Sequence, residues 1–350
     1  MITGDQGATA HAVGHDLGLS GEPELRTIDS AELESMDPEV LKGLAGNVHI
    51  FSSVTPSHKV EIVQALQRAG KVVAMTGDGI NDGPALKAAD IGVAMGGDGG
   101  TEVARMTADV VLEDNNLESM ITAIRQGRAI YFNTRNAIRY LLATNLSEIM
   151  VMFSAVASGT PTPLNPMQLL WINLVSDIFP VLALAVQPPE RDVLKRPPRD
   201  PSEPFLDSED LKRMLRQSCA ISAGTFGSYA WGRARYRSGT QAGTMAFMSL
   251  TAAQLLHMIS ARSDRHSIFS SNRPPSNRPL NAGLAGGLIL QLLTSINPFR
   301  RWLRNAPLTP LDLAVSLIAG AGLPFLVNEV FKEFELTRQS AYESKTGRHP

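Results

Sequence analysis

The long apolar runs that follow residue 139 constrain the fold more than any other feature of this sequence. The runs from Tyr140 to Ser158 and from Met167 to Val186 are each long enough to cross a bilayer as a helix. Weaker candidates follow at Met214–Trp231, Thr244–Ser260, Leu280–Asn297 and Thr309–Phe331. Roughly the first 125 residues carry no such run. The sequence therefore predicts a soluble part followed by an all-α bundle of about six transmembrane helices.

Composition excludes several other classes of protein. The formal net charge of −2 and the lack of a basic arm argue against a nucleic-acid partner. A single cysteine, Cys219, excludes an internal disulfide framework and a cysteine-rich metal site, and the seven histidines show no ligand-like spacing. The first residues contain no basic stretch followed by an apolar core, so we expect no cleavable signal peptide and expect membrane insertion to depend on the later segments.

The soluble part alternates short apolar runs with helical patterns. Strands are predicted at Val48–Phe51, Lys71–Met75, Asp90–Met95 and Ala108–Leu112. Thr55 and the proline after it predict the start of an amphipathic helix that ends at Gly70. Such alternation predicts a Rossmann-type, doubly wound and mainly parallel α/β sheet.

The stretch Thr76–Lys87 reads TGDGINDGPALK and carries most of the chemistry in the soluble part. An apolar run enters a glycine turn that holds Asp78, Asn81 and Asp82, and a proline then opens a helix. Carboxylates at a strand end can hold a hard cation while backbone amides face phosphate oxygens. A solvated turn is the alternative for the turn taken alone.

These residues resemble a known family. Thr76–Lys87 and its continuation to Gly96 resemble the hinge motif of P-type cation-transporting ATPases, which carry a haloacid dehalogenase-like phosphorylation domain. Two further strings, Thr3-Gly4-Asp5 and the PSHK that ends at Lys59, match the same domain. A lysine at a helix start is otherwise most often a solvated side chain.

The resemblance implies a role for each matching residue. Thr3 and Gly4 would hold phosphate oxygens, Asp5 would act near the nucleotide and the hinge, and Lys59 would neutralise the phosphoryl group. Asp78, supported by Asn81 and Asp82, would bind Mg²⁺. The implied cofactors are Mg²⁺ and ATP.

One motif of the family does not occur in this sequence. The phosphorylated aspartate of the family lies in an Asp-Lys-Thr-Gly-Thr string, which these 350 residues lack. The family's nucleotide-binding domain, actuator domain and first four membrane helices precede Thr-Gly-Asp. The chain thus looks like the C-terminal part of a pump, and we expect that it forms no phosphoenzyme by itself.

Polar residues interrupt the first two apolar runs. Asn145 and Glu148 lie one helical turn apart, and Asn173, Ser176 and Asp177 group on one face of the second run. A carboxylate in hydrocarbon costs at least about 2.5 kcal/mol, so such residues are usually functional. An interhelical hydrogen bond is the alternative for the two amides alone.

The same strings look like the fifth and sixth membrane helices of calcium-type pumps, where the corresponding residues ligate the transported ion. Oxygen ligands without thiolate or imidazole favour a hard cation such as Ca²⁺. Two positions depart from the family. Gln254 replaces a glutamate of pumps with two ion sites and is more often a packing or hydrogen-bonding residue, and Ile178 replaces a glycine that eases helix unwinding. Ion identity and number therefore stay open.

The predicted organisation has three parts. Residues 1–128 form the partial phosphorylation domain with the hinge and the start of a stalk helix, 129–335 the transmembrane domain, and 336–350 a polar cytoplasmic tail. Arginines between 125 and 139 and in the loop from Pro188 to Pro204 place these segments on the cytoplasmic side. We expect a multi-pass protein of the plasma (inner) membrane. The arginines at 233–237 and 300–304 run against this topology.

The most favoured function is ATP-driven transport of a cation, with Ca²⁺ and membrane lipid as partners and the missing N-terminal part as a further one. A non-catalytic remnant, or a subunit that complements a separate N-terminal half, is the second hypothesis. A membrane-tethered phosphatase is the third, but it needs its own nucleophilic aspartate, and the sequence shows none upstream.

Overall fold

The computed structural model describes residues 1–20, 25–97, 100–114, 116–236, 239–264, 266–267 and 274–346, with side chains up to residue 337. Asn115 at the start of the predicted stalk helix, Arg237, and most of the predicted tail fall outside the described side chains. The chain forms two compact units, Met1–Ala123 and Ile124–Pro350.

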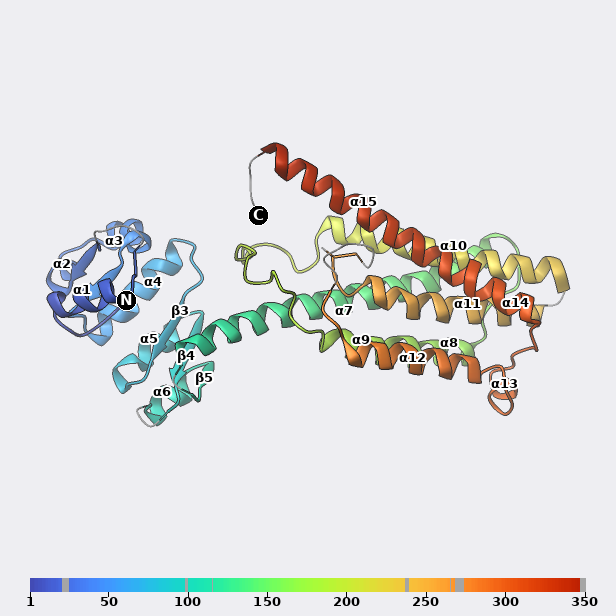
Figure 1. Ribbon diagram of the computed structural model, residues 1–350, viewed down its shortest axis with the longest axis horizontal. Helices are drawn as coiled ribbons and strands as arrows, with labels where there is room; N and C mark the ends of the chain where they lie inside the picture. Colours follow the sequence, from blue (N-terminus) through green and yellow to red (C-terminus); the bar gives the residue numbers. More distant parts are fainter. Residues whose placement is uncertain are drawn as a thin grey trace. The chain divides into compact units, whose positions relative to one another are not determined.

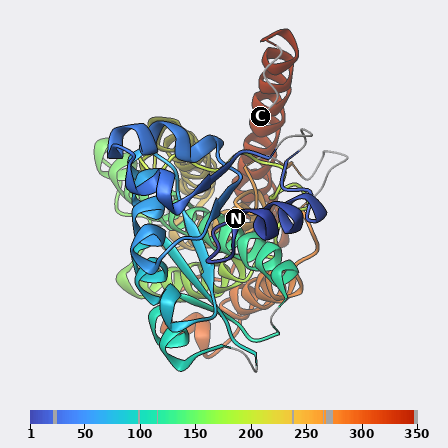
Figure 2. The same cartoon turned by 90° about the vertical axis from the view of Figure 1, so that its left-hand side faces the viewer.

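The first unit is an α/β unit whose described strands pair in parallel. Its elements are α1 (Gly7–Asp16), β1 (Thr27–Asp29), α2 (Ser30–Glu34), α3 (Pro38–Leu44), η1 (Ala45–Asn47), β2 (Ile50–Ser52), α4 (Pro56–Arg68), β3 (Ala74–Gly77), η2 (Ile80–Asp82), α5 (Gly83–Ala88), β4 (Ile91–Met95), α6 (Glu102–Thr107) and β5 (Val110–Leu112). The predicted haloacid dehalogenase-like α/β class is confirmed. The strands form two small sheets, β1-β2 and β3-β4-β5, and not the single sheet that the sequence predicts. Figure 2 views the chain from the end at which this unit, in blue and cyan, faces the reader.

Helix α4 forms where the sequence predicts it. Thr55 accepts a hydrogen bond from the backbone of His58, and a proline occupies the first helical position. Ile62 and Val63 are fully buried, and Gly70 ends the helix at φ +77°. These local signals are sufficient to set both ends of the helix.

The predicted strands start too early. β2 begins at Ile50 instead of Val48, and β5 begins at Val110 instead of Ala108. β4 begins one residue later than predicted, at Ile91. β3 begins at Ala74 instead of Lys71, and Val73 N donates to the Asp90 carboxylate at 2.8 Å instead of joining the ladder. β1 was not predicted because it has only three residues, Thr27–Asp29, and its last residue caps α2. A run this short carries no periodicity.

The second unit is helical (Figure 1). Its elements are α7 (Leu117–Ala157), α8 (Pro166–Ile172), the π-helical segment η3 (Asn173–Ile178), α9 (Phe179–Ala185), α10 (Ser208–Tyr236), α11 (Gly239–Ser260), α12 (Arg278–Leu293), α13 (Phe299–Trp302), α14 (Pro310–Ala314), the π-helical segment η4 (Val315–Gly322) and α15 (Leu323–Thr346). α7 joins the predicted stalk and the first predicted span into one helix of 41 residues, whose first turns belong to the α/β unit.

Four of the six predicted spans coincide with described helices that are long and apolar enough to cross a membrane. These are Leu117–Ala157, Pro166–Ala185, Gly239–Ser260 and Pro310–Thr337. α10 is long enough but carries many charged residues, and α12 has only 16 residues, which is short of the roughly 20 that a span needs.

α11 is the central helix of this unit. Most of its residues are buried, among them Phe247, Met248 and Leu250. It packs against α10, α12 and η4. A polar side chain that α11 carries inward can therefore find a partner only inside the bundle, as Gln254 does, whereas Ser249 Oγ has no hydrogen-bond partner among the described residues.

Candidate functional site

The turn after β3 exposes one carboxylate and buries another. Asp78 is exposed, and its backbone carbonyl accepts from Thr101 N at 2.9 Å. Asp82 is buried, and a Cβ at Gly77 would lie 2.5 Å from the Asp82 Cβ, so only glycine fits there. Asn81 is exposed beside them. The turn thus leaves Asp78 and Asn81 open to a ligand.

Lys59 and Asp82 form a partly buried ion pair. Lys59 Nζ lies 2.5 Å from Asp82 Oδ1, with side-chain exposures of 14% and 11%. The other carboxylate oxygen accepts from Gly79 N at 3.2 Å. Lys59 is therefore held at the hinge turn and is not the solvated lysine that its position alone would suggest.

The Thr3 turn is built separately. Thr3 Oγ1 donates to the Asp5 carboxylate and accepts from Asp5 N, both at 3.1 Å, while Thr3 N bonds Phe51 O at 2.9 Å. Gly4 and Asp5 are exposed. Among the described residues no hydrogen bond joins this turn to the pair of Lys59 and Asp82.

These residue types fit Mg²⁺ and phosphate. Exposed carboxylate and amide oxygens at Asp78 and Asn81 suit a hard cation, and the Asp78 side chain makes no hydrogen bond within the part of the chain that the structure describes. Lys59 supplies a positive charge next to this turn. The role of each residue remains a prediction.

The second group of site residues lies in the helical unit and centres on Gln254. Gln254 Nε2 donates to Glu148 Oε1 at 3.1 Å and to Thr144 O at 3.3 Å, and its Oε1 accepts from Ser176 Oγ at 2.8 Å. α7, η3 and α11 thus meet through one amide. The expectation that Gln254 is a packing or hydrogen-bonding residue is confirmed, and its partners Glu148 and Ser176 come from the tertiary structure.

The widened turn η3 carries the second acid. Tyr140 Oη donates to Ser176 O at 2.7 Å, and the Ser176 hydroxyl shares its one proton between Gln254 Oε1 and Ile172 O, which lies 2.6 Å away. Asp177 Oδ1 is buried and has no hydrogen-bond partner in the described part of the chain. The turn widens although Ile178 stands where a glycine was expected to ease unwinding.

The two amides predicted with these acids lie elsewhere. Asn145 is exposed and donates to Leu141 O of its own helix at 2.8 Å, and Asn173 is also exposed. Glu148 and Ser176, by contrast, are buried. The structure therefore brings together Glu148, Ser176 and Gln254 and leaves both amides at the surface of the unit.

An ion-pair network connects α7 with α10 and with the segment that follows α11. Arg139 pairs with Asp210 at 2.6 Å and with Asp264, which also lies 2.9 Å from Arg213. Burial alone raises the pKa of Asp264, but the charges of Arg139 and Arg213 outweigh it and lower the pKa to about 2. Nothing in the sequence spacing suggested this network.

Three further side chains meet only through the tertiary structure. Ligand atoms of Glu190, Asp192 and His266 lie within 4.8 Å of one another. Arg196 already contacts both carboxylates. The arginine supplies the positive charge that a metal ion would otherwise bring.

Comparison with known proteins agrees with both units. The family model described as haloacid dehalogenase-like hydrolase matches residues 1–90, and the model described as cation transporting ATPase, C-terminus, matches residues 161–334.

Three curated relatives illustrate the similarity. "Calcium-transporting ATPase 1" of Bacillus cereus is 37% identical over 95% of this chain and 39% of its own length. "Calcium-transporting ATPase" of Bacillus subtilis is 39% identical over 91% of this chain and 35% of its own length. "Calcium-transporting ATPase type 2C member 1" of Homo sapiens is 35% identical over 97% of this chain and 37% of its own length.

The chain spans well under half the length of these relatives. Together with the four apolar helices, the matches show that the chain is a membrane protein and belongs to the P-type cation-transporting ATPases, with their haloacid dehalogenase-like region followed by their C-terminal helical region.

Proposed function

We propose that this chain carries the cation-binding helices and part of the phosphorylation domain of an ATP-driven calcium pump. One observation supports this most strongly. Glu148, Ser176 and Gln254 converge from three helices, and the neighbouring Asp177 keeps a buried oxygen without a hydrogen-bond partner among the described residues. A carboxylate oxygen left in this way is costly unless a ligand completes it.

The donor set favours Ca²⁺ as the transported cation. Carboxylate, amide and hydroxyl oxygens are hard ligands, and no thiolate or imidazole atom joins them in the described network. The relatives are named calcium-transporting ATPases. In the proposal Glu148 and Asp177 bind the ion, Ser176 adds a hydroxyl oxygen, and Gln254 orients Glu148. The two predicted amide ligands, Asn145 and Asn173, are left out because both are exposed at the surface of the unit.

The α/β unit would supply the energy-coupling part. Asp78, supported by Asn81 and Asp82, would hold Mg²⁺, which neutralises phosphate charge when bound. Thr3, Gly4 and Lys59 would contact the phosphate groups of ATP, and Asp5 would act near the nucleotide. Lys59 and Asp82 hold each other in place at this turn. α7 runs without a break from Leu117 to beyond Glu148, so a movement at its start can reach the cation site.

The proposal includes the predicted organisation. We place the domain boundary at residues 128 and 129 and retain six membrane helices, with α10 and α12 spanning in the company of the four apolar ones. The protein would then be a multi-pass protein of the plasma membrane, with the α/β unit and the tail after residue 335 in the cytoplasm. The proposal does not fix the number of ions per cycle, because Gln254 replaces a glutamate of pumps with two ion sites.

Calcium binding to the full 350-residue chain in detergent tests the cation site. We expect Glu148→Gln and Asp177→Asn each to weaken equilibrium binding of radioactive Ca²⁺ by at least tenfold. Glu209→Gln is the matched control, because Glu209 is exposed and pairs only with Lys212 among the described residues. Unchanged binding in both site variants, or a preference for another cation, would contradict the calcium assignment.

Phosphorylation distinguishes a pump from a non-catalytic subunit or remnant. The chain would be co-expressed with an N-terminal part that carries the Asp-Lys-Thr-Gly-Thr motif. Transfer of phosphate from ATP that needs Mg²⁺ and Ca²⁺ and is lost in Asp78→Asn supports the pump. A chain that binds Ca²⁺ but supports no transfer would be a non-catalytic subunit, and phosphatase activity of the chain alone would favour the third hypothesis.

A further inference from the structure

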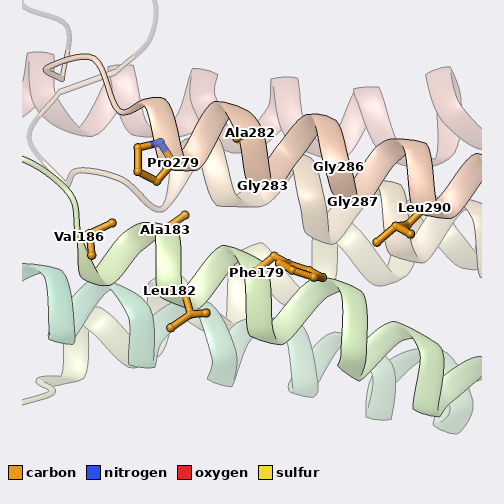
Figure 3. Close-up of a pocket in the computed structure, with 10 residues that line it drawn as sticks. All are labelled: Phe179, Leu182, Ala183, Val186, Pro279, Ala282, Gly283, Gly286, Gly287 and Leu290. Carbon is orange, nitrogen blue, oxygen red and sulfur yellow. The ribbon is translucent and has the colours of Figure 1, made fainter.

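Two neighbouring residues after α9 line two different cavities. Val186 lies at one end of the larger cavity, between α9 and α12, whose described lining residues carry no polar side chain (Figure 3). The next residue, Gln187, lines a smaller cavity of about 20 Å³. Ala129 and Asn133 of α7 and Arg262, which follows α11, line it as well. The smaller cavity therefore offers polar groups to a ligand.

Gln187 connects the end of α9 with three other segments. Its Oε1 accepts from Asn277 Nδ2 at 2.7 Å and from Arg262 Nε at 3.3 Å. Its backbone carbonyl accepts from Asn133 Nδ2 at 2.7 Å. Asn277 is the N-cap of α12, Arg262 follows α11, and Asn133 belongs to α7. These bonds hold the Gln187 side chain in place where the four segments meet.

The same bonds fix the orientation of the Gln187 amide. Turning the amide over would set its NH₂ group against the donors of Asn277 and Arg262, and both bonds would be lost. Nε2 is the atom that remains, and it has no hydrogen-bond partner among the described residues although Gln187 is only 4% exposed. A buried N–H group without a partner is costly, so a ligand that accepts a hydrogen bond would stabilise this site.

The size of the cavity limits the ligand to one small molecule. A site for a water molecule needs at least about 10–15 Å³. The cavity, at about 20 Å³, meets this need once. Phosphate and organic ligands are too large for it.

The charges around the cavity favour a neutral ligand. Arg196 and Arg262 both line it and disfavour a cation, and the Gln187 amide presents a donor. The Glu190 carboxylate, which pairs with Arg196, disfavours an anion. A water molecule can accept from Gln187 Nε2 and donate to oxygen atoms of the lining residues, among which Asn133, Asn136 and Glu190 carry suitable ones.

We propose that this cavity binds one water molecule, which accepts a hydrogen bond from Gln187 Nε2 and donates to oxygen atoms of the lining residues. The water completes the polar junction between α7, the loop after α9, the segment after α11 and the start of α12. It holds Gln187 in the position in which its carbonyl anchors Asn133 of α7. This site is separate from the proposed cation and phosphate sites.

A crystal structure of the full chain, at a resolution that shows ordered water, tests the proposal. We expect one density peak about 2.7–3.2 Å from Gln187 Nε2. Crystals grown in bromide in place of chloride should show no anomalous signal at this peak. An empty cavity with ordered surroundings overturns the proposal, and so does a bromide signal, which would assign the cavity to an anion.

Variants of Ala129 test what the water contributes. Ala129 lines the cavity from α7 and is 3% exposed. In Ala129→Ser a hydroxyl takes the place of the water, so the peak should be lost and the chain should melt as the wild type does. In Ala129→Val the cavity is filled without a polar atom. This variant should lose the peak and melt about 4 °C lower, the shift expected for one unpaired buried donor.

Ala157→Val is the matched control, because Ala157 is the exposed last residue of the same helix. It should keep both the water peak and the wild-type melting temperature. A peak that persists in both Ala129 variants overturns the proposal, as does a valine variant that melts as the wild type does. If the valine variant does not fold, the wild-type and serine structures still decide. These measurements need neither Ca²⁺ nor ATP, so their failure and that of the proposed function are distinguishable.

Discussion

Gln254 on α11 donates its Nε2 to the carboxylate of Glu148 on α7 at 3.1 Å, and the Oε1 of the same amide accepts from Ser176 at 2.8 Å. An amide offers one donor group and one acceptor atom, whereas an ionised carboxylate only accepts. Gln254 can therefore bridge an acid and a hydroxyl. A glutamate at this position could not donate to Glu148 without a proton.

Gln254→Glu should make the stability of the chain depend on cations. Two buried carboxylates in contact cannot both ionise cheaply, so one takes a proton or the pair takes a cation. We expect a lower melting temperature in chelator at pH 8 and recovery on adding Ca²⁺. Gln254→Leu should be destabilised by about 1–3 kcal/mol in both conditions, because Glu148 and Ser176 lose a partner. A Glu variant that melts as the wild type does in chelator would contradict this.

Tyr140→Phe should loosen the widened turn η3. Its hydroxyl donates to the buried Ser176 carbonyl, and losing that bond costs about 1–2 kcal/mol. Faster hydrogen exchange of residues 173–178 would report the change. Tyr131→Phe on the same helix is the control, since its buried hydroxyl has no partner in the described structure and its loss should be neutral. Equal rates of hydrogen exchange at residues 173–178 in the two variants would show that the Tyr140 hydroxyl does not hold η3 in place.

Asp264→Asn should change the acid sensitivity of the chain. The pKa of Asp264 is lowered to about 2, so its contribution to stability is complete above about pH 4 and disappears as the pH falls toward 2. The side chain is 29% exposed, which limits the effect to about 1 kcal/mol. Melting temperatures of wild type and variant should differ at pH 6 and converge near pH 2. A constant difference across this range would contradict the assignment.

Lys59→Met should destabilise the α/β unit by about 3 kcal/mol, because it leaves the buried Asp82 carboxylate without its counter-ion. Adding Asp82→Asn should recover much of the loss. Lys42→Met is the control, since its pair with Glu39 is exposed and worth less than about 1 kcal/mol. Hydrogen exchange in β3 and β4 measures the difference. Equal protection in the two lysine variants would show that the partly buried pair adds nothing.

Gly224→Ala should weaken the packing of α10 against η4. A Cβ at Gly224 would lie 2.5 Å from Gly320 O, and such overpacking costs about 1–3 kcal/mol. Gly227→Ala, one turn later, meets open space and should be neutral or stabilising by up to about 1 kcal/mol. Thermal melting in detergent compares the two. Equal melting temperatures of the two variants would show that α10 and η4 accommodate the added methyl group at Gly224 without loss of stability.

Much of the fold could be predicted because its signals are local. The proline after Thr55 and the positive φ at Gly70 set the ends of α4, and the acids in the apolar runs mark Glu148 and Asp177. A continuous helix from the stalk into the first span was also expected, and α7 is one helix of 41 residues. A change from polar to apolar side chains at Tyr140 alters the surroundings of a helix and does not end it.

The composition of the proposed cation site could be predicted only in part. Glu148 and Gln254 are 106 residues apart, and only the packing of α11 against its neighbours brings them into contact. Asn145 shows the opposite case. Its spacing from Glu148 is one helical turn, but its side chain bonds its own helix and faces outward.

The sequence by itself determined the family, the α/β class, the apolar helices and the acids within them, since each depends on residues a few positions apart. The tertiary structure decided which polar groups meet. It joined Gln254 to Glu148 and Ser176, Lys59 to Asp82, and Arg139 to Asp264. The physical reason is that a buried polar group must find a partner within hydrogen-bonding distance, and helix packing determines which groups lie that close.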